Sequence, residues 1–182
     1  MQYFSRGKRG KIYLEKDYAV KKSNPIRVKN EVKWLKILNK YKIGPRLVKY
    51  NQNSFKYNFI KGDFIIQFIL KSNKKLIKKI LIDVLNQCRT LDKLKVNKKE
   101  MHHPIKHIII KNKKAYMIDF ERCYKTNKPK NVTQFCQFIL NYLKNILKEK
   151  GFKIDKKVLN ALIRYKHNQD EKNFNEILKI IR

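Results

Sequence analysis

The chain has 182 residues, of which 42% are hydrophobic and 12% aromatic, so it is long and apolar enough for one domain with a buried core. This composition excludes a disordered chain in spite of 33% charged residues, and the length excludes two large domains. No apolar run approaches the roughly 20 residues of a membrane span, and the first residues lack the apolar centre of a signal peptide. We therefore expect a cytoplasmic protein that has no membrane partner.

The charge balance is strongly basic, with a formal net charge of +32 and an isoelectric point of about 10.1. Clustered lysines and arginines favour nucleic acid, because they release counterions from phosphates when they bind. Here lysine is spread along nearly every segment, and a proteome with a biased composition produces the same profile. RNA or a ribonucleoprotein is therefore a candidate partner of the basic surface, but we do not take RNA binding as the primary function.

The three cysteines, Cys88, Cys123 and Cys136, are odd in number and widely spaced. They form no Cys-x-x-Cys pair, which argues against both a disulfide framework and a zinc knuckle. We expect buried or idle thiols.

The first half of the chain has the pattern of short strands around a single helix. A Glu15-Lys16-Asp17 turn divides the β-prone start, and Asn24-Pro25 precedes the helix, which Ile43-Gly44-Pro45 ends. The expected strands are residues 4–14, 18–22, 47–50 and 55–60, and the expected helix runs from near residue 27 to residue 41.

After the sharp connection Lys61-Gly62-Asp63, the pattern becomes mostly helical. Helices are expected at residues 64–70, 74–94, 132–148, 156–168 and 172–181, with a β-hairpin at residues 107–118. The predicted fold class is α+β in a single domain over residues 1–182. It consists of a small β-rich lobe with an antiparallel sheet and one helix, residues 1–61, and a mostly helical lobe, residues 62–182.

The hairpin delivers a carboxylate, Asp119, from the end of an apolar strand. Its apolar runs, residues 108–110 and 115–118, flank the turn-prone segment Lys111-Asn112-Lys113-Lys114. A cation is expected near Asp119, because burying an unpaired carboxylate is costly. By itself the pattern also fits an Asp that caps a turn, with Phe120 returning to the core.

Three further features precede this carboxylate. Gly7 and Gly10 form a Gly-x-x-Gly bend between two strands, where backbone N–H groups can approach phosphate oxygens closely. Lys21 lies on the next strand, and Glu31 lies on the helix face that also carries Leu35. A carboxylate that points inward requires a basic partner, which Lys21 can supply. Taken singly, these features also occur in plain hairpins and on solvated strands.

A glycine loop, a strand lysine, a helix glutamate and a strand-exit aspartate occur in this order in protein kinases. The chain resembles a minimal, atypical protein kinase, similar to the small archaeal predicted serine/threonine kinases. It is more distantly similar to the RIO kinases and to the small kinase of the tRNA-threonylcarbamoylation complex. The resemblance covers residues 5–138. Its motifs are Gly7 and Gly10, Ala19-Val-Lys21, Glu31, Ile43-Gly-Pro-Arg-Leu-Val48, Phe59-Ile-Lys-Gly62, His107-Ile-Ile-Ile110, Ile118-Asp-Phe-Glu121 and Pro129-Lys-Asn-Val-Thr-Gln134.

The resemblance implies a protein-kinase-like fold with a reduced helical lobe, and ATP and Mg²⁺ as cofactors. It implies phosphoryl transfer to serine or threonine of an unknown protein substrate or of the chain itself. Lys21 would bind the α- and β-phosphates and pair with Glu31, and Asp119 would chelate Mg²⁺. Phosphoryl transfer needs positioning and charge neutralisation more than covalent chemistry, and these roles supply both.

Two further groups of residues are implied to hold the nucleotide. Gly7 and Gly10 would bring backbone N–H groups to the phosphates. The segment from Asn58 to Ile60 would offer backbone groups to adenine.

The catalytic loop departs from the family pattern. Where His-x-Asp-Leu-x-x-x-x-Asn is expected, the chain has Glu100-Met-His-His-Pro-Ile-Lys-His107. Counting back from the strand puts His107 at the place of the metal-binding Asn and His102 at the place of the catalytic Asp. Glu100 is the first candidate base if the loop is two residues longer, and neutral His102 or His103 is the alternative.

Glu121 replaces the glycine that follows Asp-Phe in the family, and the connection to the next helix is too short for a long activation loop. Regulation by loop phosphorylation is therefore not expected. Three functions stay open: a serine/threonine protein kinase, a nucleotide-binding pseudokinase that serves as an interaction module, and a basic RNA-binding protein.

Overall fold

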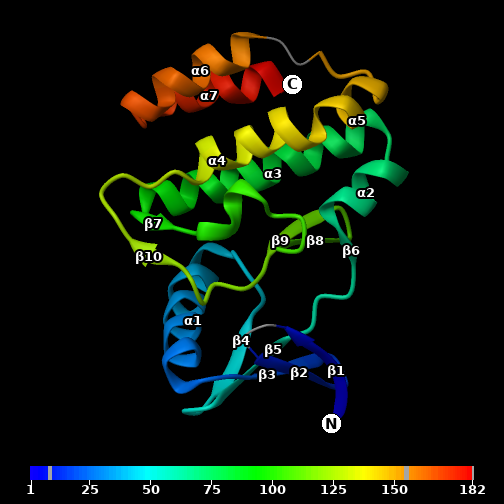
Figure 1. Ribbon diagram of the computed structural model, residues 1–182, viewed down its shortest axis with the longest axis vertical. Coiled ribbons are helices and arrows are strands. Elements are labelled where there is room, and N and C mark those ends of the chain that lie inside the picture. Colours follow the sequence, from blue (N-terminus) through cyan, green and yellow to red (C-terminus); the bar gives the residue numbers. More distant parts are fainter. Residues whose placement is uncertain (8–9, 154–155, 182) are drawn as a thin grey trace. The chain divides into compact units, whose positions relative to one another are not determined.

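The computed structural model describes residues 1–7, 10–153 and 156–181, and their fold is α+β with antiparallel sheets, as the sequence predicts (Figure 1). The chain forms two compact units. The first comprises Met1–Gly62 and Tyr116–Cys123, and the second comprises Asp63–Ala115 and Tyr124–Arg182. The segment that carries Asp119 thus belongs to the first unit, although the chain reaches it only after much of the second.

The first unit is built on a five-stranded antiparallel sheet. Its strands are β1 (Gln2–Gly7), β2 (Gly10–Glu15), β3 (Tyr18–Lys22), β4 (Leu47–Tyr50) and β5 (Ser54–Asn58), in the spatial order β1-β2-β3-β5-β4. In the central strand β3, Lys21 is paired with Ile12 of β2 and with Phe55 of β5. Neighbours on both sides therefore fix the backbone of Lys21.

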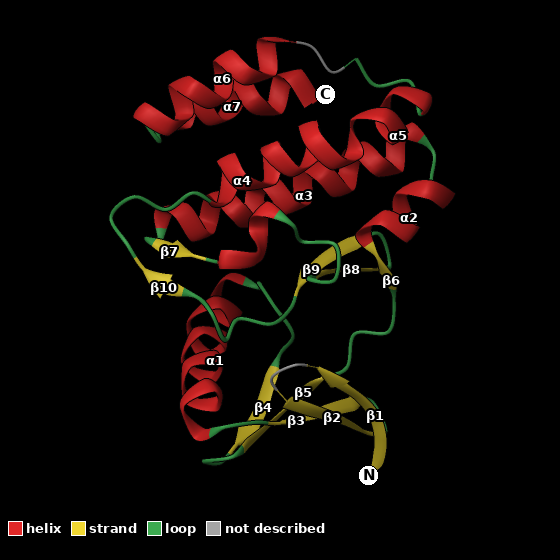
Figure 2. Ribbon diagram, viewed as in Figure 1, coloured by secondary structure: helices red, strands yellow, loops and turns green. Residues whose placement is uncertain are grey.

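One helix, α1 (Pro25–Leu38), packs against this sheet (Figure 2). It starts at Pro25, slightly before the predicted residue 27, because Pro25 suits the first helical position and Asn24 accepts a hydrogen bond from the N–H of Ile26 at 2.9 Å. A 3₁₀ turn, Asn39–Tyr41, follows it. The buried residues of α1 are Val28, Glu31, Val32, Trp34, Leu35 and Leu38. The predicted inward position of Glu31 is confirmed.

The second unit is mostly helical, with α2 (Ile65–Lys71), α3 (Lys74–Lys93), α4 (Asn131–Phe138), α5 (Lys144–Glu149), α6 (Lys156–His167) and α7 (Glu171–Ile181). Figure 1 shows α4 beside α3. The helix expected at residues 132–148 is interrupted by a π-helical turn, Ile139–Leu143, which a hydrophobic period cannot reveal because it spans a single turn. Among the helices of the described residues, none is both long enough and apolar enough to cross a membrane.

Short strands complete the structure. The expected hairpin is confirmed as β8 (Ile108–Lys111) and β9 (Lys114–Met117), which form a sheet in the order β6-β8-β9 with β6 (Asp63–Phe64). Asn112 and Lys113 at its turn both have left-handed backbones, as a two-residue hairpin turn of type I′ requires. A second small sheet pairs β7 (Val96–Asn97) with β10 (Tyr124–Lys125). Two-residue strands carry no periodic signal, so the sequence did not predict β6, β7 or β10.

A buried polar cluster holds the chain that leads into the 3₁₀ turn Lys99–His102. Asp92 of α3, 1% exposed, accepts hydrogen bonds from the backbone N–H groups of Asn131 and Val132 at the start of α4. The side-chain oxygen of Asn131 in turn accepts from the N–H of Lys98 at 2.9 Å. The first amides of α4 are thereby satisfied, and the segment before the 3₁₀ turn is fixed to the helices.

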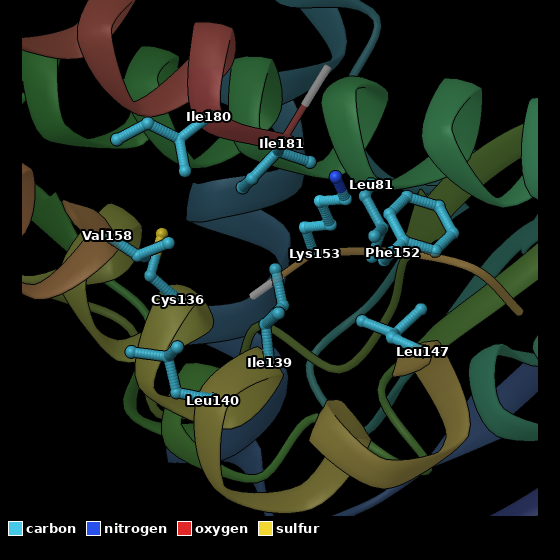
Figure 3. A pocket seen from close by; sticks show the side chains of 10 residues that line it. All are labelled: Leu81, Cys136, Ile139, Leu140, Leu147, Phe152, Lys153, Val158, Ile180 and Ile181. Carbon is cyan, nitrogen blue, oxygen red and sulfur yellow. The ribbon is translucent and has the colours of Figure 1, made fainter. Parts of the chain in front are cut away.

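An apolar cavity of about 20 Å³ lies inside the second unit (Figure 3). It is lined by Leu81, Cys136, Ile139, Leu140, Leu147, Phe152, Lys153, Val158, Ile180 and Ile181. Such a volume holds about one water molecule, so the cavity is a packing gap and not a nucleotide site.

Cys88, Cys123 and Cys136 are free and buried, as their spacing predicts. Burial raises the pKa of the thiols of Cys88 and Cys136 above the ordinary value, so both stay protonated at neutral pH.

Substitution of Gly44 tests how tightly the segment after α1 packs against the ring of Phe120. Both Gly44 and Gly151 have left-handed backbones, but a Cβ at position 44 would lie 2.8 Å from the Phe120 ring, whereas one at position 151 would meet nothing closer than 3.9 Å. We expect Gly151→Ala to lower the free energy of unfolding by about 1–2 kcal/mol through its backbone alone. Gly44→Ala should lose a further ~1–3 kcal/mol through overpacking. Urea unfolding measures both losses, and equal values would contradict the tight contact.

Candidate functional site

Lys21 lies at the centre of three carboxylates in the first unit. Its Nζ donates to Oε2 of Glu31 at 2.7 Å, to Oδ1 of Asp119 at 3.0 Å and to Oε2 of Glu121 at 3.3 Å. The structure thus brings together Lys21, Glu31 and Asp119, which the sequence assigned to one site. The structure adds Glu121 to this group. The sequence analysis noted Glu121 only because it replaces the glycine that follows Asp-Phe in protein kinases, and assigned it no role in the site.

The members of this cluster differ in their exposure to solvent. The side chains of Lys21, Glu31 and Glu121 are 11%, 5% and 2% exposed, whereas that of Asp119 is 34% exposed. Among these four groups, Asp119 is therefore the one that a ligand arriving from solvent reaches first.

Glu31 is fixed by hydrogen bonds at both carboxylate oxygens. Oε2 accepts from Lys21, and Oε1 accepts from the backbone N–H of Phe120 at 3.1 Å. A carboxylate that is 4% exposed as a whole residue needs such partners, because burying it unpaired is costly. Glu31 therefore joins β3 to the segment that carries Asp119.

Two other side chains of α1 bind the backbone of the same segment. The amide of Asn30 donates to the carbonyl oxygens of Glu121 at 2.6 Å and Cys123 at 3.2 Å. The indole N–H of Trp34 also donates to the Cys123 carbonyl, at 2.9 Å. Trp34 is a core residue, 1% exposed, but its ring nitrogen also positions the site.

The backbone of Asp119 is left-handed, with φ of 63°. Among residues other than glycine, Asp and Asn adopt this conformation most readily. The turn follows directly after β9 and Ile118, and it directs the Asp119 side chain to Lys21 while Phe120 is fully buried. The sequence offered a turn cap and a site carboxylate as alternatives, and in the structure Asp119 lies in a left-handed turn with its carboxylate bonded to Lys21.

The electrostatics keep Lys21 charged. Burial alone lowers the pKa of Lys21, but the attraction of Glu31 and Asp119, together with the hydrogen bond to Glu31, outweighs burial and raises it above the ordinary value. Lys21 is therefore an ammonium at neutral pH. Burial raises the pKa of Glu31, Lys21 opposes this shift, and the negative charge of Asp119 adds to it.

The carboxylates of Glu31, Asp119 and Glu121 form a set of oxygen donors. One oxygen of each lies within 4.8 Å of the others. Carboxylate oxygens are the protein ligands that Mg²⁺ prefers, usually one or two of them together with phosphate oxygens and water. Three carboxylates at this spacing could hold a divalent cation, and Nζ of Lys21 already bonds to one oxygen of each. The signal that could have identified Glu121 is the repeat of a carboxylate two residues after Asp119.

Gly7 and Gly10 close the hairpin between β1 and β2, where they face each other as the last pair of the ladder. Lys8 and Arg9, the middle of the predicted Gly-x-x-Gly bend, lie outside the described residues. A Cβ at Gly10 would lie 2.7 Å from the carbonyl oxygen of Lys22, so the close approach of β2 to β3 requires a glycine there. Gly10 therefore lies near the end of β3 that carries Lys21.

The residues expected to meet adenine lie at the end of β5. Asn58 is paired with Tyr18 across the sheet, and its N–H donates to the carbonyl of Arg46 at 2.9 Å. The N–H of Phe59 donates to the carbonyl of Asp17 at 2.8 Å. Since both amides are bonded within the protein, the expected adenine contacts rest on Ile60 and on the carbonyl groups of this segment.

The remaining predicted residues belong to the second unit. Glu100 is buried in the 3₁₀ turn, and its carboxylate accepts from Nζ of Lys98 at 3.2 Å. His102 is exposed, with Nδ1 2.7 Å from the carbonyl oxygen of Lys99. His107 is half-buried before β8, and its backbone N–H donates to the carbonyl oxygen of Pro104 at 2.9 Å.

No protein-family model matches the chain, and no curated protein is similar enough to count as a relative.

Lys21→Met should destabilise the first unit by leaving buried carboxylates without their ammonium. We expect the free energy of unfolding to fall by about 3–5 kcal/mol at neutral pH. The loss should shrink in acid. Without Lys21 the folded-state pKa of Glu31 rises further above its unfolded-state value. The folded protein then keeps its stability at a pH below the unfolded-state pKa, where Glu31 is protonated in both states. It loses stability as the pH rises through the folded-state pKa, because the buried carboxyl must ionise without a partner.

Urea unfolding at about pH 5 and about pH 8 measures this difference. Lys56→Met is the matched control, because Lys56 lies on the same sheet and pairs at 3.0 Å with Glu15, whose side chain is more exposed. Its loss should be much smaller. A loss for Lys21→Met that does not change with pH would contradict the electrostatic account of the cluster.

Proposed function

We propose that the chain is an ATP-dependent serine/threonine protein kinase of a minimal, atypical kind. The observation that carries this proposal is a strand lysine, Lys21, held at 2.7 Å from the helix carboxylate Glu31 and at 3.0 Å from the strand-exit carboxylate Asp119. A buried ammonium kept charged and fixed in place is the kind of group that neutralises phosphate oxygens during phosphoryl transfer.

The make-up of the first unit supports the proposal. A glycine hairpin, the central strand β3, the helix α1 and the segment after β9 all contribute to one unit around Lys21. The same parts occur in the same order in protein kinases, where the small lobe is an antiparallel sheet with one helix. A protein-kinase-like fold is thus the finer description that we propose for the α+β architecture.

The donor set fits Mg²⁺, which in this function neutralises the charge on the phosphates when it is bound with ATP. Asp119, the most exposed member of the set, is the residue that we expect to hold the ion. Glu121 is a second candidate ligand, because its oxygen lies within the same set. Glu31 keeps Lys21 in position for the phosphates.

Among the candidate bases, the local bonding favours His102 over Glu100. Glu100 is buried and paired with Lys98 at 3.2 Å, whereas His102 is exposed. If Nδ1 of neutral His102 donates to the carbonyl oxygen of Lys99 at 2.7 Å, Nε2 is left as the proton acceptor.

A nucleotide-binding pseudokinase is the second candidate function, and the same loop favours it. The first candidate base, Glu100, is buried in an ion pair, and the standard catalytic Asp is replaced by a histidine. The chain would then bind MgATP through Lys21 and Asp119 without transferring phosphate.

Nucleotide binding is tested by thermal unfolding with ATP, with and without Mg²⁺. We expect a Mg²⁺-dependent rise in Tm, since a ligand at 100 times its Kd stabilises the folded state by about 2.7 kcal/mol. Asp119→Asn should remove the rise. Asp17→Asn, which changes an exposed turn carboxylate of the same unit, is the matched control and should retain it. If ATP does not stabilise the unsubstituted protein, the nucleotide site is refuted.

Phosphoryl transfer is tested with radiolabelled ATP, Mg²⁺ and either the chain itself or a generic protein as acceptor. His102→Asn should lower the rate by about 10²–10⁴-fold, as loss of a general base does, and leave the ATP-dependent rise in Tm unchanged. His167→Asn, at an exposed position of α6, should change neither.

Other outcomes of the transfer assay separate the alternatives. If Glu100→Gln abolishes transfer and His102→Asn does not, Glu100 is the base. If the protein binds MgATP and transfers no phosphate, it is a pseudokinase. If it binds no nucleotide but binds RNA tightly and with strong salt dependence, RNA binding is its function.

A further inference from the structure

A groove of about 760 Å³ lies on the first unit, between α1 and the turn that joins β4 to β5. Val28 and Val32 are buried residues of α1 that line it, while Ile26, also on its lining, is 78% exposed. Tyr50, which is 52% exposed, lines it from the end of β4. The groove therefore offers apolar surface to solvent at a place wide enough for several side chains of a partner.

The charged residues of the groove are all basic. Lys29, Lys33 and Lys36 recur at intervals of four and three residues, so they form one stripe along α1. Among the described residues that line the groove, none carries a carboxylate. Nζ of Lys36 donates to the Tyr50 hydroxyl and lies 4.2 Å from the centre of its ring, which links α1 to the end of β4.

A few lysines elsewhere in the chain pair with carboxylates of the chain itself. Lys56 pairs with Glu15, and Lys71 pairs with Asp63. The lining of the groove contains apolar and basic groups together. A partner that matches this lining carries acidic groups next to apolar ones.

We propose that this groove binds an acidic, amphipathic peptide segment of another protein. Apolar side chains of the segment pack on Ile26 and Tyr50, exposed apolar residues of the lining, and its carboxylates pair with Lys29 and Lys33. This is the mode in which a helix or short peptide lays its apolar face into a groove and charged residues set its orientation. RNA fits the surface less well, because among the described residues of the lining Tyr50 is the only aromatic side chain on which a base could stack, and the other apolar residues are aliphatic.

The inference does not depend on the proposed nucleotide site. The groove is lined by residues other than Lys21, Glu31, Asp119 and Glu121, and peptide binding can be measured without ATP. If the protein binds no nucleotide, the peptide proposal still stands. If it binds no peptide, the nucleotide proposal still stands.

The probe is a phage-displayed library of random peptides, panned on the full chain. Peptides that combine acidic and apolar residues should be enriched, and their synthetic, fluorescein-labelled copies should bind in a polarisation assay. The double variant Lys29→Glu/Lys33→Glu and the single variant Ile26→Asp should each weaken binding by about tenfold or more. All three positions are exposed, and an unchanged Tm verifies that the variants fold.

The matched control is Lys11→Glu/Lys40→Glu, which reverses two exposed charges of the same unit outside the groove lining. It should keep the affinity within about twofold, since general attraction by the net charge is a small part of binding. If panning enriches no peptide, or if the control variant loses as much affinity as the groove variant, the proposal fails. If the groove variants lose RNA binding and no peptide binding, the surface is an RNA site and the proposal also fails.

Discussion

The first unit depends on the burial of one ammonium group among three carboxylates. Glu31 and Glu121 are almost completely buried, and they come from a helix and from a segment that is distant in sequence. Lys21, on the central strand of the sheet, bonds to both of them and to Asp119. Because an unpaired buried charge costs several kcal/mol, strand, helix and returning segment are stable only in this mutual arrangement.

The returning segment is held by more than charge. Phe120 is buried against Gly44, where no side chain fits, and Asn30 and Trp34 of α1 bind the backbone beyond it. These contacts leave Asp119 in a left-handed turn with about a third of its side chain exposed. A carboxylate presented to solvent beside a fixed ammonium is the feature from which the proposed nucleotide function follows.

The helix α1 carries two separate surfaces. On its buried side, Glu31 bonds to Lys21, and Trp34 bonds to the backbone of the segment that carries Asp119. Another side of the helix contributes lysines and apolar residues to the groove. A 14-residue helix provides room for both, since its side chains point in all directions around the axis. The proposed binding of a peptide and the proposed binding of a nucleotide thus use the same element through different residues.

The sequence by itself determined the α+β class, the presence of α1 but not its exact ends, the hairpin of β8 and β9, and the inward position of Glu31. Capping residues, turn residues and hydrophobic periods are local signals, and they decide such features. Only the tertiary structure decided that Glu121 bonds to Lys21 and that Asp92 caps the start of α4. Both depend on contacts between residues far apart in the chain, and no local pattern encodes which distant partner satisfies a buried charge.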